Sequence, residues 1–243
     1  MARITSPDDI KQLGTIMSVW AHPDDESFTS AGIMATAVKN GQQVVCITAT
    51  KGEAGVQDES RWPAAKLGEI RAKEMQAALK KIGITDHYWL NYQDGLCNCV
   101  QTREAVAKIK DLIEKYQPDS ILTFGPDGIT GHTDHQTVSK WVDLATEGKD
   151  IKVYHTIEEE DHYQKYMIEA DKKFDIYFNI DKPPTRKAKD CDIAYDLPER
   201  VIDQKYQALK AMPSQTEAMI KNTPDDMLKS MLCLECFVKA ESK

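Results

Sequence analysis

The chain has 243 residues, of which 41% are hydrophobic and 29% are charged, a composition typical of a globular protein with one α/β domain or one domain and a subdomain. Its net charge of −8 argues against a nucleic-acid partner, because phosphate binding needs a basic face. It has no apolar stretch near the ~20 residues of a membrane span and no signal-peptide core at its N-terminus. The six cysteines do not suggest a disulfide framework in a chain of this length, so we expect a reduced, cytoplasmic protein.

The first half of the chain alternates apolar runs with helical patterns. Buried strands are predicted over 16–20, 43–49, 87–90 and 119–124, and helices over 28–40, 63–82, 102–116 and from 133 onward. Thr102 is expected to cap one helix, and Thr133 with Gln136 has the spacing of a capping box for the last one. Strands and helices that alternate in this way indicate parallel βαβ units. We therefore expect an α/β fold with a doubly wound, mostly parallel sheet.

After about residue 150 the pattern changes. It predicts strands over 152–157, 175–180 and 192–197, a charged helix or insertion over 158–173, and closing helices over 198–211 and 224–239. Cys233 and Cys236 fall in the last helix, and we interpret them as core residues because no second cysteine pair accompanies them. We expect residues 1–150 to form the catalytic core and residues 151–243 to form a small α+β extension that completes the same domain.

Two polar clusters each follow a predicted strand. Their members are His22, Asp24 and Asp25 after the first strand and His132, Asp134 and His135 after the fourth. In the strand order 3-2-1-4-5-6 these two strands are neighbours, and ligands of open α/β sheets bind at the carboxyl ends of the strands. We therefore expect the two clusters to form one site.

Two histidines and a carboxylate are a ligand set for zinc, with the fourth position left to water. His22 and Asp25 can reach one ion from a single turn, and His132 and His135 lie one helical turn apart, so that both can point into the crevice. A carboxylate beside the metal can take a proton from the bound water, and the other histidine can donate to the oxyanion or the leaving group.

These residues also have simpler explanations. Asp24, Asp25 and Glu26 are compatible with the acidic first turn of a helix, and His132 with a loop histidine bonded to the backbone. Because both clusters follow core strands, we favour a chemical role for the pair but treat Glu26 as a helix-terminal acid. The remaining histidines are interpreted as structural or surface residues: His87, His155 and His162.

The motifs AHPDDE at 21–26 and GHTDH at 131–135 make the chain similar to the LmbE/PIG-L family of zinc-dependent N-deacetylases. Further matches in the same order are TKGEAG at 50–55, LGEIRAKEMQAALKKIGI at 67–84, YQDG at 92–95 and KYQALKAMPSQT at 205–216. The resemblance implies a Rossmann-like fold, one zinc ion per chain and a homo-oligomer. It also implies a small-molecule substrate, an N-acetylglucosamine-type sugar whose acetamide is hydrolysed.

Carried over by position, the resemblance implies a role for each residue of the site. His22, Asp25 and His135 correspond to zinc ligands, Asp24 to the general base, and His132 to the residue that assists the tetrahedral intermediate. Asp134 is expected to orient a histidine. Arg71 and Asp94 are expected to contact sugar hydroxyls, with a helix-surface ion pair as the alternative.

The chain departs from the family pattern at one position near the second motif. Thr130 stands where some members have an aromatic residue. Any oxyanion contact or sugar stacking from that residue is therefore absent or altered.

Three alternatives to a zinc N-deacetylase stay open. An amidase of the same fold would cleave a larger acyl group from an amino-sugar conjugate. A non-haem iron enzyme also uses two histidines and a carboxylate, but the adjacent Asp24 and the parallel α/β pattern disfavour it. A dinucleotide-binding regulator is disfavoured because the loop after the first strand lacks G-x-G-x-x-G and carries acids.

Overall fold

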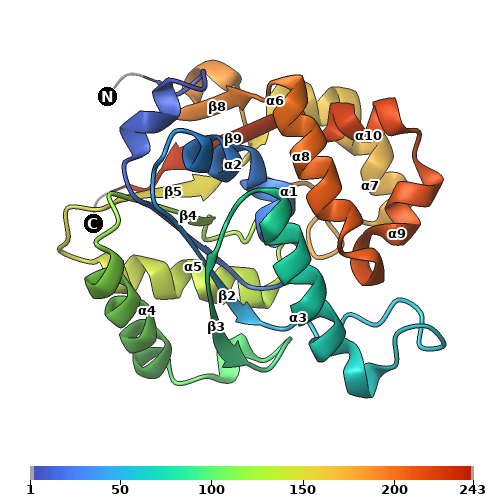
Figure 1. The fold of residues 1–243 in the computed structure, drawn as a ribbon, viewed down its shortest axis with the longest axis horizontal. Helices are drawn as coiled ribbons and strands as arrows, with labels where there is room; N and C mark the ends of the chain where they lie inside the picture. The colour runs from blue at the N-terminus through green and yellow to red at the C-terminus, as the bar shows by residue number, and fades with distance from the viewer. Residues whose placement is uncertain (1–2, 242–243) are drawn as a thin grey trace.

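The computed structural model describes residues 3–241, which build a seven-stranded sheet with helices on both faces (Figure 1). The strands run in the order β3-β2-β1-β4-β5-β9-β8. The first five are mutually parallel, whereas β9 runs antiparallel to both β5 and β8. The strands of this sheet are β1 Ile16–Trp20, β2 Val44–Thr50, β3 Asp86–Tyr92, β4 Ser120–Phe124, β5 Lys152–Thr156, β8 Ile193–Asp196 and β9 Leu234–Lys239.

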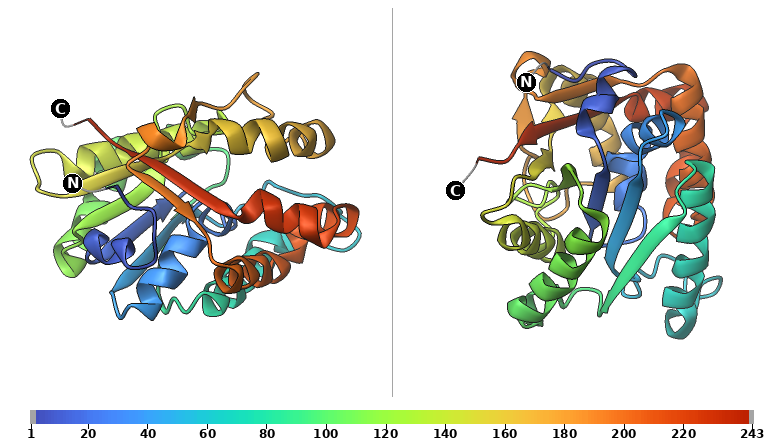
Figure 2. Two further views of the ribbon diagram at one scale, coloured as in Figure 1. Left: turned by 90° about the horizontal axis from the view of Figure 1, so that it is seen from above. Right: turned by 60° about the vertical axis from the view of Figure 1, so that its left-hand side comes forward.

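The helices form two layers around the sheet (Figure 2). One layer holds α2 Ala31–Lys39, α3 Ala64–Lys81 and α8 Glu199–Lys210, and the other holds α4 Thr102–Tyr116 and α5 Thr133–Thr146. Shorter helices lie near the carboxyl ends of the parallel strands: α1 Asp25–Thr29, α6 Glu160–His162, α7 Ile168–Phe174, α9 Pro213–Asn222 and α10 Asp225–Leu232. The remaining elements are 3₁₀ turns at Asp9–Leu13, Cys97–Cys99 and Ala188–Asp190, a π turn at Tyr163–Met167, and a two-stranded ladder of β6 Glu158–Glu159 with β7 Thr185–Arg186.

The centre of the sheet is the core of the molecule. Strands β1, β2 and β4 are buried at every residue, as expected of parallel strands that are covered on both faces. At the carboxyl ends of β1 and β4, the rings of Trp20 and Phe124 meet edge to face, with centroids 4.8 Å apart. This packing holds together the two points from which the polar clusters leave the sheet.

The predicted α/β architecture is confirmed, and so is the strand order 3-2-1-4-5 at its centre. Two capping predictions are wrong. Thr102 is the first residue of α4, whose N-cap is Gln101. The N-cap of α5 is His132, whose side chain accepts a hydrogen bond from the Asp134 backbone NH, and no capping box forms between Thr133 and Gln136. The ring of His132 therefore accepts the hydrogen bond at the N-terminus of α5 that the sequence pattern had assigned to the hydroxyl of Thr133.

The C-terminal part differs more from prediction. Residues 175–180 form turns and bends, and the predicted strand is absent there. The predicted helix over 224–239 is α10 followed by β9, so Cys233 ends the helix and Cys236 lies in a strand. Helix α9 was not predicted. The division at residue 150 stays a prediction, although β8 and β9 belong to the same sheet as the first five strands.

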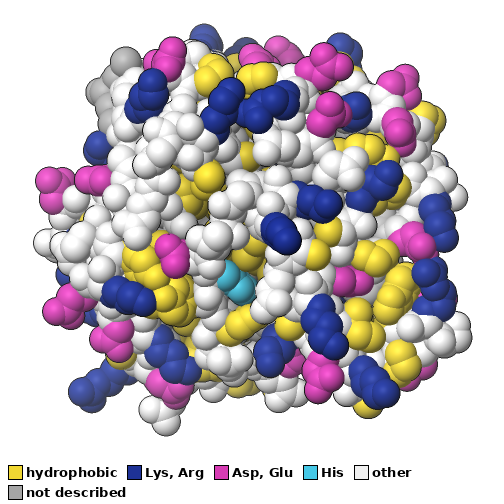
Figure 3. All heavy atoms as spheres, in the orientation of Figure 1, with side chains coloured by type: hydrophobic (Ala, Val, Ile, Leu, Met, Phe, Trp, Pro, Cys, Tyr) yellow, Lys and Arg dark blue, Asp and Glu magenta, His cyan; other side chains and the backbone are white. Residues whose placement is uncertain are grey.

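Two further observations concern the surface and the helices. On the face shown in Figure 3, acidic and basic side chains are interspersed. Among the residues that the structure describes, we find no helix with the length and apolar character needed to cross a membrane.

Candidate active site

The two polar clusters meet where β1 and β4 end. These strands pair in parallel, with Ile16 opposite Ser120 and Ser18 opposite Leu122, so their carboxyl ends open at the same edge of the sheet. All six predicted members lie close together there: His22, Asp24, Asp25, His132, Asp134 and His135. The prediction that the clusters form one site is confirmed as a matter of geometry.

Three of these side chains converge on one point. His22 Nδ1 lies 3.1 Å from His135 Nε2. The Asp25 carboxylate places one oxygen 3.6 Å from His22 Nδ1 and the other 3.4 Å from His135 Nε2. Two ligands of a tetrahedral ion with bonds of about 2.1 Å lie about 3.4 Å apart, so this spacing matches atoms that share one metal ion.

The second nitrogen of His22 faces the opposite way. Its Nε2 lies 3.0 Å from Asp94 Oδ1 and 3.3 Å from Asp134 Oδ2. Asp134 is fully buried and also accepts hydrogen bonds from the backbone NH groups of Gly95 and Cys97. A carboxylate on one ring nitrogen fixes the tautomer and leaves the other nitrogen free for a metal.

His135 is oriented in the same manner by a backbone carbonyl. Its Nδ1 lies 2.9 Å from the Gly128 oxygen and 3.2 Å from Thr130 Oγ1, so Nδ1 carries the proton and Nε2 is left as an acceptor. Gly128 has a positive φ of 77°, and a Cβ there would lie 3.0 Å from the Cβ of His135. Only glycine therefore brings this carbonyl against the ring without strain.

The charges of the three convergent groups differ. Burial opposes the protonation of His22, but the carboxylates of Asp134, Asp25 and Asp94 outweigh it and hold the His22 pKa well above its usual value. Burial lowers the pKa of His135 to about 4. Burial opposes ionisation of Asp25, yet His135 and His22 outweigh it and hold its pKa below the usual range. The site therefore concentrates a carboxylate and a neutral imidazole, both of which are ready to bind a cation.

Asp24 has an unusual backbone. Its φ of 114° is a region that non-glycine residues rarely adopt. The turn is held by Glu26, whose carboxylate accepts a hydrogen bond of 3.1 Å from the Asp24 NH and another from the Ser27 hydroxyl. Burial, supported by the nearby Asp25, raises the pKa of Asp24 to about 7 against the opposing charge of Arg71. A carboxylate with such a pKa suits proton transfer near neutrality.

Glu26 is the one acid of the motif that we had interpreted as a helix-terminal residue. It is completely buried, and burial raises its pKa to about 8. Glu26 lies in the first turn of α1, as expected, but it is buried there and its contacts support the Asp24 turn. The small buried neighbours Ser27 and Ser30 are the sequence signal that could have indicated a buried position.

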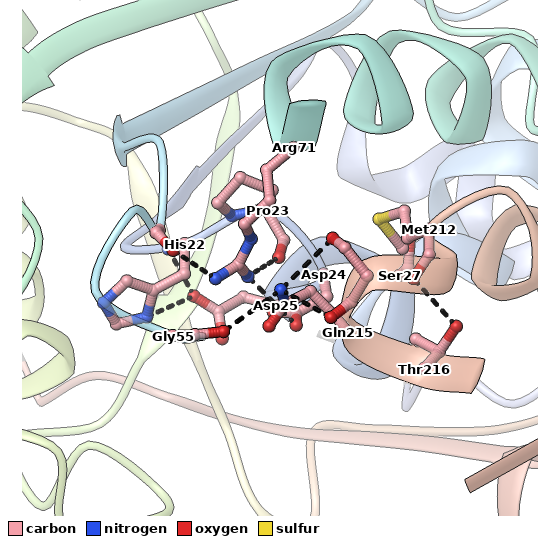
Figure 4. A network of polar contacts seen from close by, with 12 residues as sticks. His22, Pro23, Asp24, Asp25, Ser27, Gly55, Arg71, Met212, Gln215 and Thr216 are labelled. Atoms are coloured by element: carbon pink, nitrogen blue, oxygen red, sulfur yellow. Dashed lines mark hydrogen bonds and ion pairs between the residues drawn. The ribbon is translucent and has the colours of Figure 1, made fainter. Parts of the chain in front are cut away.

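Arg71 reaches the same turn from α3 (Figure 4). Its Nη1 donates to the Gly52 carbonyl at 2.7 Å, and its Nη2 donates to the Pro23 carbonyl at 2.7 Å and to Asp24 Oδ2 at 3.3 Å. A Cβ on Gly52, whose φ is 65°, would lie 2.2 Å from Arg71 Nη1. Arg71 is 4% exposed, so it is no helix-surface residue.

Asp94 joins the loops after β2 and β3. Its Oδ2 accepts from the Ala54 NH at 2.9 Å, and its own NH donates to Glu53 Oε1 at 3.1 Å. The contact with His22 holds the pKa of Asp94 at about 2 against the effect of burial. Whether Arg71 and Asp94 bind a sugar stays a prediction, since both already have protein partners.

His132 stands at the mouth of the site. Its Nδ1 accepts the Asp134 NH at 3.1 Å, which places the ring proton of the neutral form on Nε2. Burial, together with the charge of His22, lowers its pKa. The result is a neutral imidazole with one free N–H, a group that can donate to an oxyanion.

Two cavities open on this centre. The polar cavity, of about 420 Å³, is lined by His22, Arg71, Asp94, His132 and Gln215, among others. The apolar cavity, of about 350 Å³, is lined by Phe28, Ile129, Met219, Met231 and Leu232, among others. Asp25, Thr130, His135 and Phe178 border both cavities. Phe178 was missed by the sequence analysis; its ring is 59% exposed and meets His132 edge to face at 6.1 Å.

Comparison with known proteins identifies the family. The sequence profile described as "PIG-L: GlcNAc-PI de-N-acetylase" matches residues 17–146, which include both motifs and more than half of the chain. This chain belongs to the PIG-L family. The matched region contains all of the elements that position the convergent residues, from β1 to α5.

Individual curated relatives and solved structures resemble the chain to different extents. A 1D-myo-inositol 2-acetamido-2-deoxy-alpha-D-glucopyranoside deacetylase of Catenulispora acidiphila is 33% identical over 143 residues, which is 50% of this chain and 47% of that protein. The chain thus spans about half the length of this and similar curated relatives. The fold resembles N,N'-diacetylchitobiose deacetylase from Pyrococcus horikoshii, with a TM-score of 0.64 and 19% identity over 95% of this chain and 85% of the other. It also resembles the zinc-inhibited form of teicoplanin deacetylase Orf2, with a TM-score of 0.65 and 16% identity over 94% of this chain and 100% of that one.

Proposed function

We propose that this PIG-L protein is a zinc-dependent hydrolase that removes an acyl group, in the simplest case acetyl, from the nitrogen of an N-acetylglucosamine-type sugar. One observation carries the proposal: His22 Nδ1, His135 Nε2 and the Asp25 carboxylate converge within 3.1–3.6 Å, and a second carboxylate lies directly beside them. The names of the relatives support the substrate class.

The donor set fits a zinc ion. Two imidazole nitrogens and one carboxylate leave a fourth position of a tetrahedral site open for water or substrate. His22, Asp25 and His135 would hold the ion, and the partners on their far sides would keep the ligands in place. When bound, zinc supplies a Lewis acid and lowers the pKa of its water.

The remaining residues supply the proton transfers. Asp24 would accept a proton from the attacking water, because its carboxylate adjoins Asp25 and has a pKa near 7. His132 would donate its Nε2 proton to the oxyanion or the departing amine. Asp134 would keep His22 in one tautomer from behind, through the contact of 3.3 Å.

The polar cavity would receive the sugar. It combines the carboxylate of Asp94, the guanidinium of Arg71 and the amide of Gln215, whose Nε2 also donates to the Gly55 carbonyl at 3.4 Å (Figure 4). Such groups suit hydroxyls as partners. Assembly into homo-oligomers and a cytoplasmic location stay predictions.

The test is acetate release by metal-free protein to which single metals are returned. The purified chain would be treated with a chelator, reconstituted with Zn²⁺ or Fe²⁺, and incubated with N-acetylglucosamine, N,N'-diacetylchitobiose and the inositol-linked sugar. We expect release with zinc, none after chelation, and none from the His22→Ala variant, while Met227→Trp serves as a folded control. Activity with iron alone would favour the non-haem iron alternative, and no release from any sugar would refute the proposal.

A further inference from the structure

We propose that the apolar cavity binds the acyl chain of the substrate, so that this protein prefers N-acyl amino sugars whose acyl group is longer than acetyl. The inference rests on the proposed function and specifies its substrate class. It starts from the position of the cavity relative to the convergent ligands.

The apolar cavity begins at the reacting centre. Asp25 and His135, which would hold the metal, line both cavities. An amide carbonyl at this point therefore has the polar cavity on one side and the apolar cavity on the other. The amine of the scissile bond carries the sugar, which suits the polar side. The acyl group is then directed into the apolar side.

The walls of the apolar cavity combine polar side chains with a larger apolar surface. Twelve of the side chains that line it are large and apolar, and they come from elements far apart in the sequence; among them are Phe28, Ile129, Met219, Met231 and Leu232. Apart from Phe28 in α1, they come from β4 and the loop after it, from residues 157–178, from the helices α9 and α10, and from β9. A cavity with such walls favours an apolar occupant.

Four of the ionisable side chains that line it, those of Glu158, His162, Tyr177 and Glu235, are already paired. The Tyr177 hydroxyl donates to Glu158 at 2.6 Å, and His162 Nε2 lies 3.1 Å from the Ser230 carbonyl. Glu235 accepts from Lys205 Nζ at 2.8 Å and from two backbone NH groups of α2. These four groups therefore do not require a polar ligand.

The volume exceeds what acetyl needs. The cavity measures about 350 Å³, roughly twelve times the ~30 Å³ that one water molecule occupies in the liquid. The methyl of an acetyl group is similar in size to a single water. Burial of additional methylenes in this space would stabilise the complex in proportion to the apolar area removed from water.

The first experiment uses a series of N-acyl glucosamines with acetyl, butanoyl, hexanoyl and octanoyl groups, and it measures the release of free glucosamine by the zinc-loaded protein. We expect kcat/KM to rise about three- to fourfold for each added methylene until the cavity is filled. A kcat/KM that falls from acetyl to butanoyl would overturn the inference and leave the deacetylase proposal intact. No glucosamine from any member would refute both.

The second experiment narrows the cavity. Met231→Trp in α10 places a larger side chain in its wall, and Leu234→Trp in β9 does so from another element in case the first variant does not fold. Both should lower the ratio of octanoyl to acetyl kcat/KM at least tenfold. Met227→Trp makes the same change one turn earlier on α10, outside the cavity lining, and should leave the ratio unchanged. An unchanged ratio in both folded cavity variants would contradict the assignment.

Discussion

The two walls of the site are built by different means. The polar wall comes from short loops that directly follow β1, β2, β3 and β4, and its groups are locked to one another by hydrogen bonds such as those of Asp134 and Arg71. The apolar wall comes largely from residues after β5, in short helices and turns and at the start of strand β9. From this comparison we infer that reactivity depends on the polar groups at the carboxyl ends of the parallel strands. The choice of substrate depends on the residues after β5.

The largest effect should come from the polar wall. Asp24→Asn should retain zinc and the fold but lower kcat by about 10²–10⁴-fold, because the amide cannot accept the proton. Asp25→Asn should weaken zinc binding first, with partial recovery of activity in excess zinc. Metal stoichiometry measured beside kcat distinguishes the two. Loss of zinc by Asp24→Asn with retention by Asp25→Asn would reverse the roles of these neighbours.

The next effect concerns how the apolar wall is anchored. Glu235 in β9 forms a buried ion pair with Lys205 of α8, in which the two side chains are 0% and 1% exposed. Lys205→Met should lower the free energy of unfolding by about 3–5 kcal/mol, because it leaves an uncompensated buried carboxylate. Urea denaturation measures this loss.

Two controls accompany that substitution. Lys221→Met breaks an exposed pair with Glu217, where Lys221 is 64% exposed, and should change the stability by less than about 1 kcal/mol. The double variant Lys205→Met/Glu235→Gln should recover part of the loss, since it removes the unpaired charge. Equal stability of the two lysine variants would show that the buried pair does not anchor this wall.

The smallest effect should come from the replacement of Arg71. This substitution distinguishes a residue that positions the Asp24 turn from one that contacts the sugar. Both of its Nη nitrogens donate to protein groups, namely the Gly52 and Pro23 carbonyls and Asp24, so Arg71→Ala should lower kcat/KM by about 10–100-fold on a sugar and on a minimal acetamide alike. Arg61→Ala, in the loop before α3 and exposed, should change neither. A loss confined to the sugar substrate would instead support the sugar contact that the resemblance implies.

The sheet and its polar edge were predictable because local patterns determine them. Fully buried parallel strands appear in the sequence as uninterrupted apolar runs, and Ile16–Trp20 and Ser120–Phe124 were placed within one residue of their observed bounds. Once these two strands were neighbours, His22 and His135 had to approach each other despite a separation of 113 residues.

The secondary structure of the residues after β5 was less predictable, because it depends on tertiary contacts. Residues 225–239 have an apolar character that suits a helix or a strand, and the choice of strand for Leu234–Lys239 depends on pairing with β5 and β8. Residues 175–180 include a short run of apolar and aromatic residues that suits a strand, yet they form turns and a bend. Phe178 lies in this stretch, so no periodic signal could have placed it beside His132.

The positive φ of Asp24 has a consequence for how such a protein evolves. Holding an aspartate at 114° opposes the preference of its backbone, whereas glycine would accept that geometry readily. Replacement of Asp24 by glycine should therefore make the fold more stable by up to about 1 kcal/mol while removing the proton acceptor. Selection for stability alone would favour glycine at this position. The presence of Asp24 therefore indicates selection for catalytic turnover.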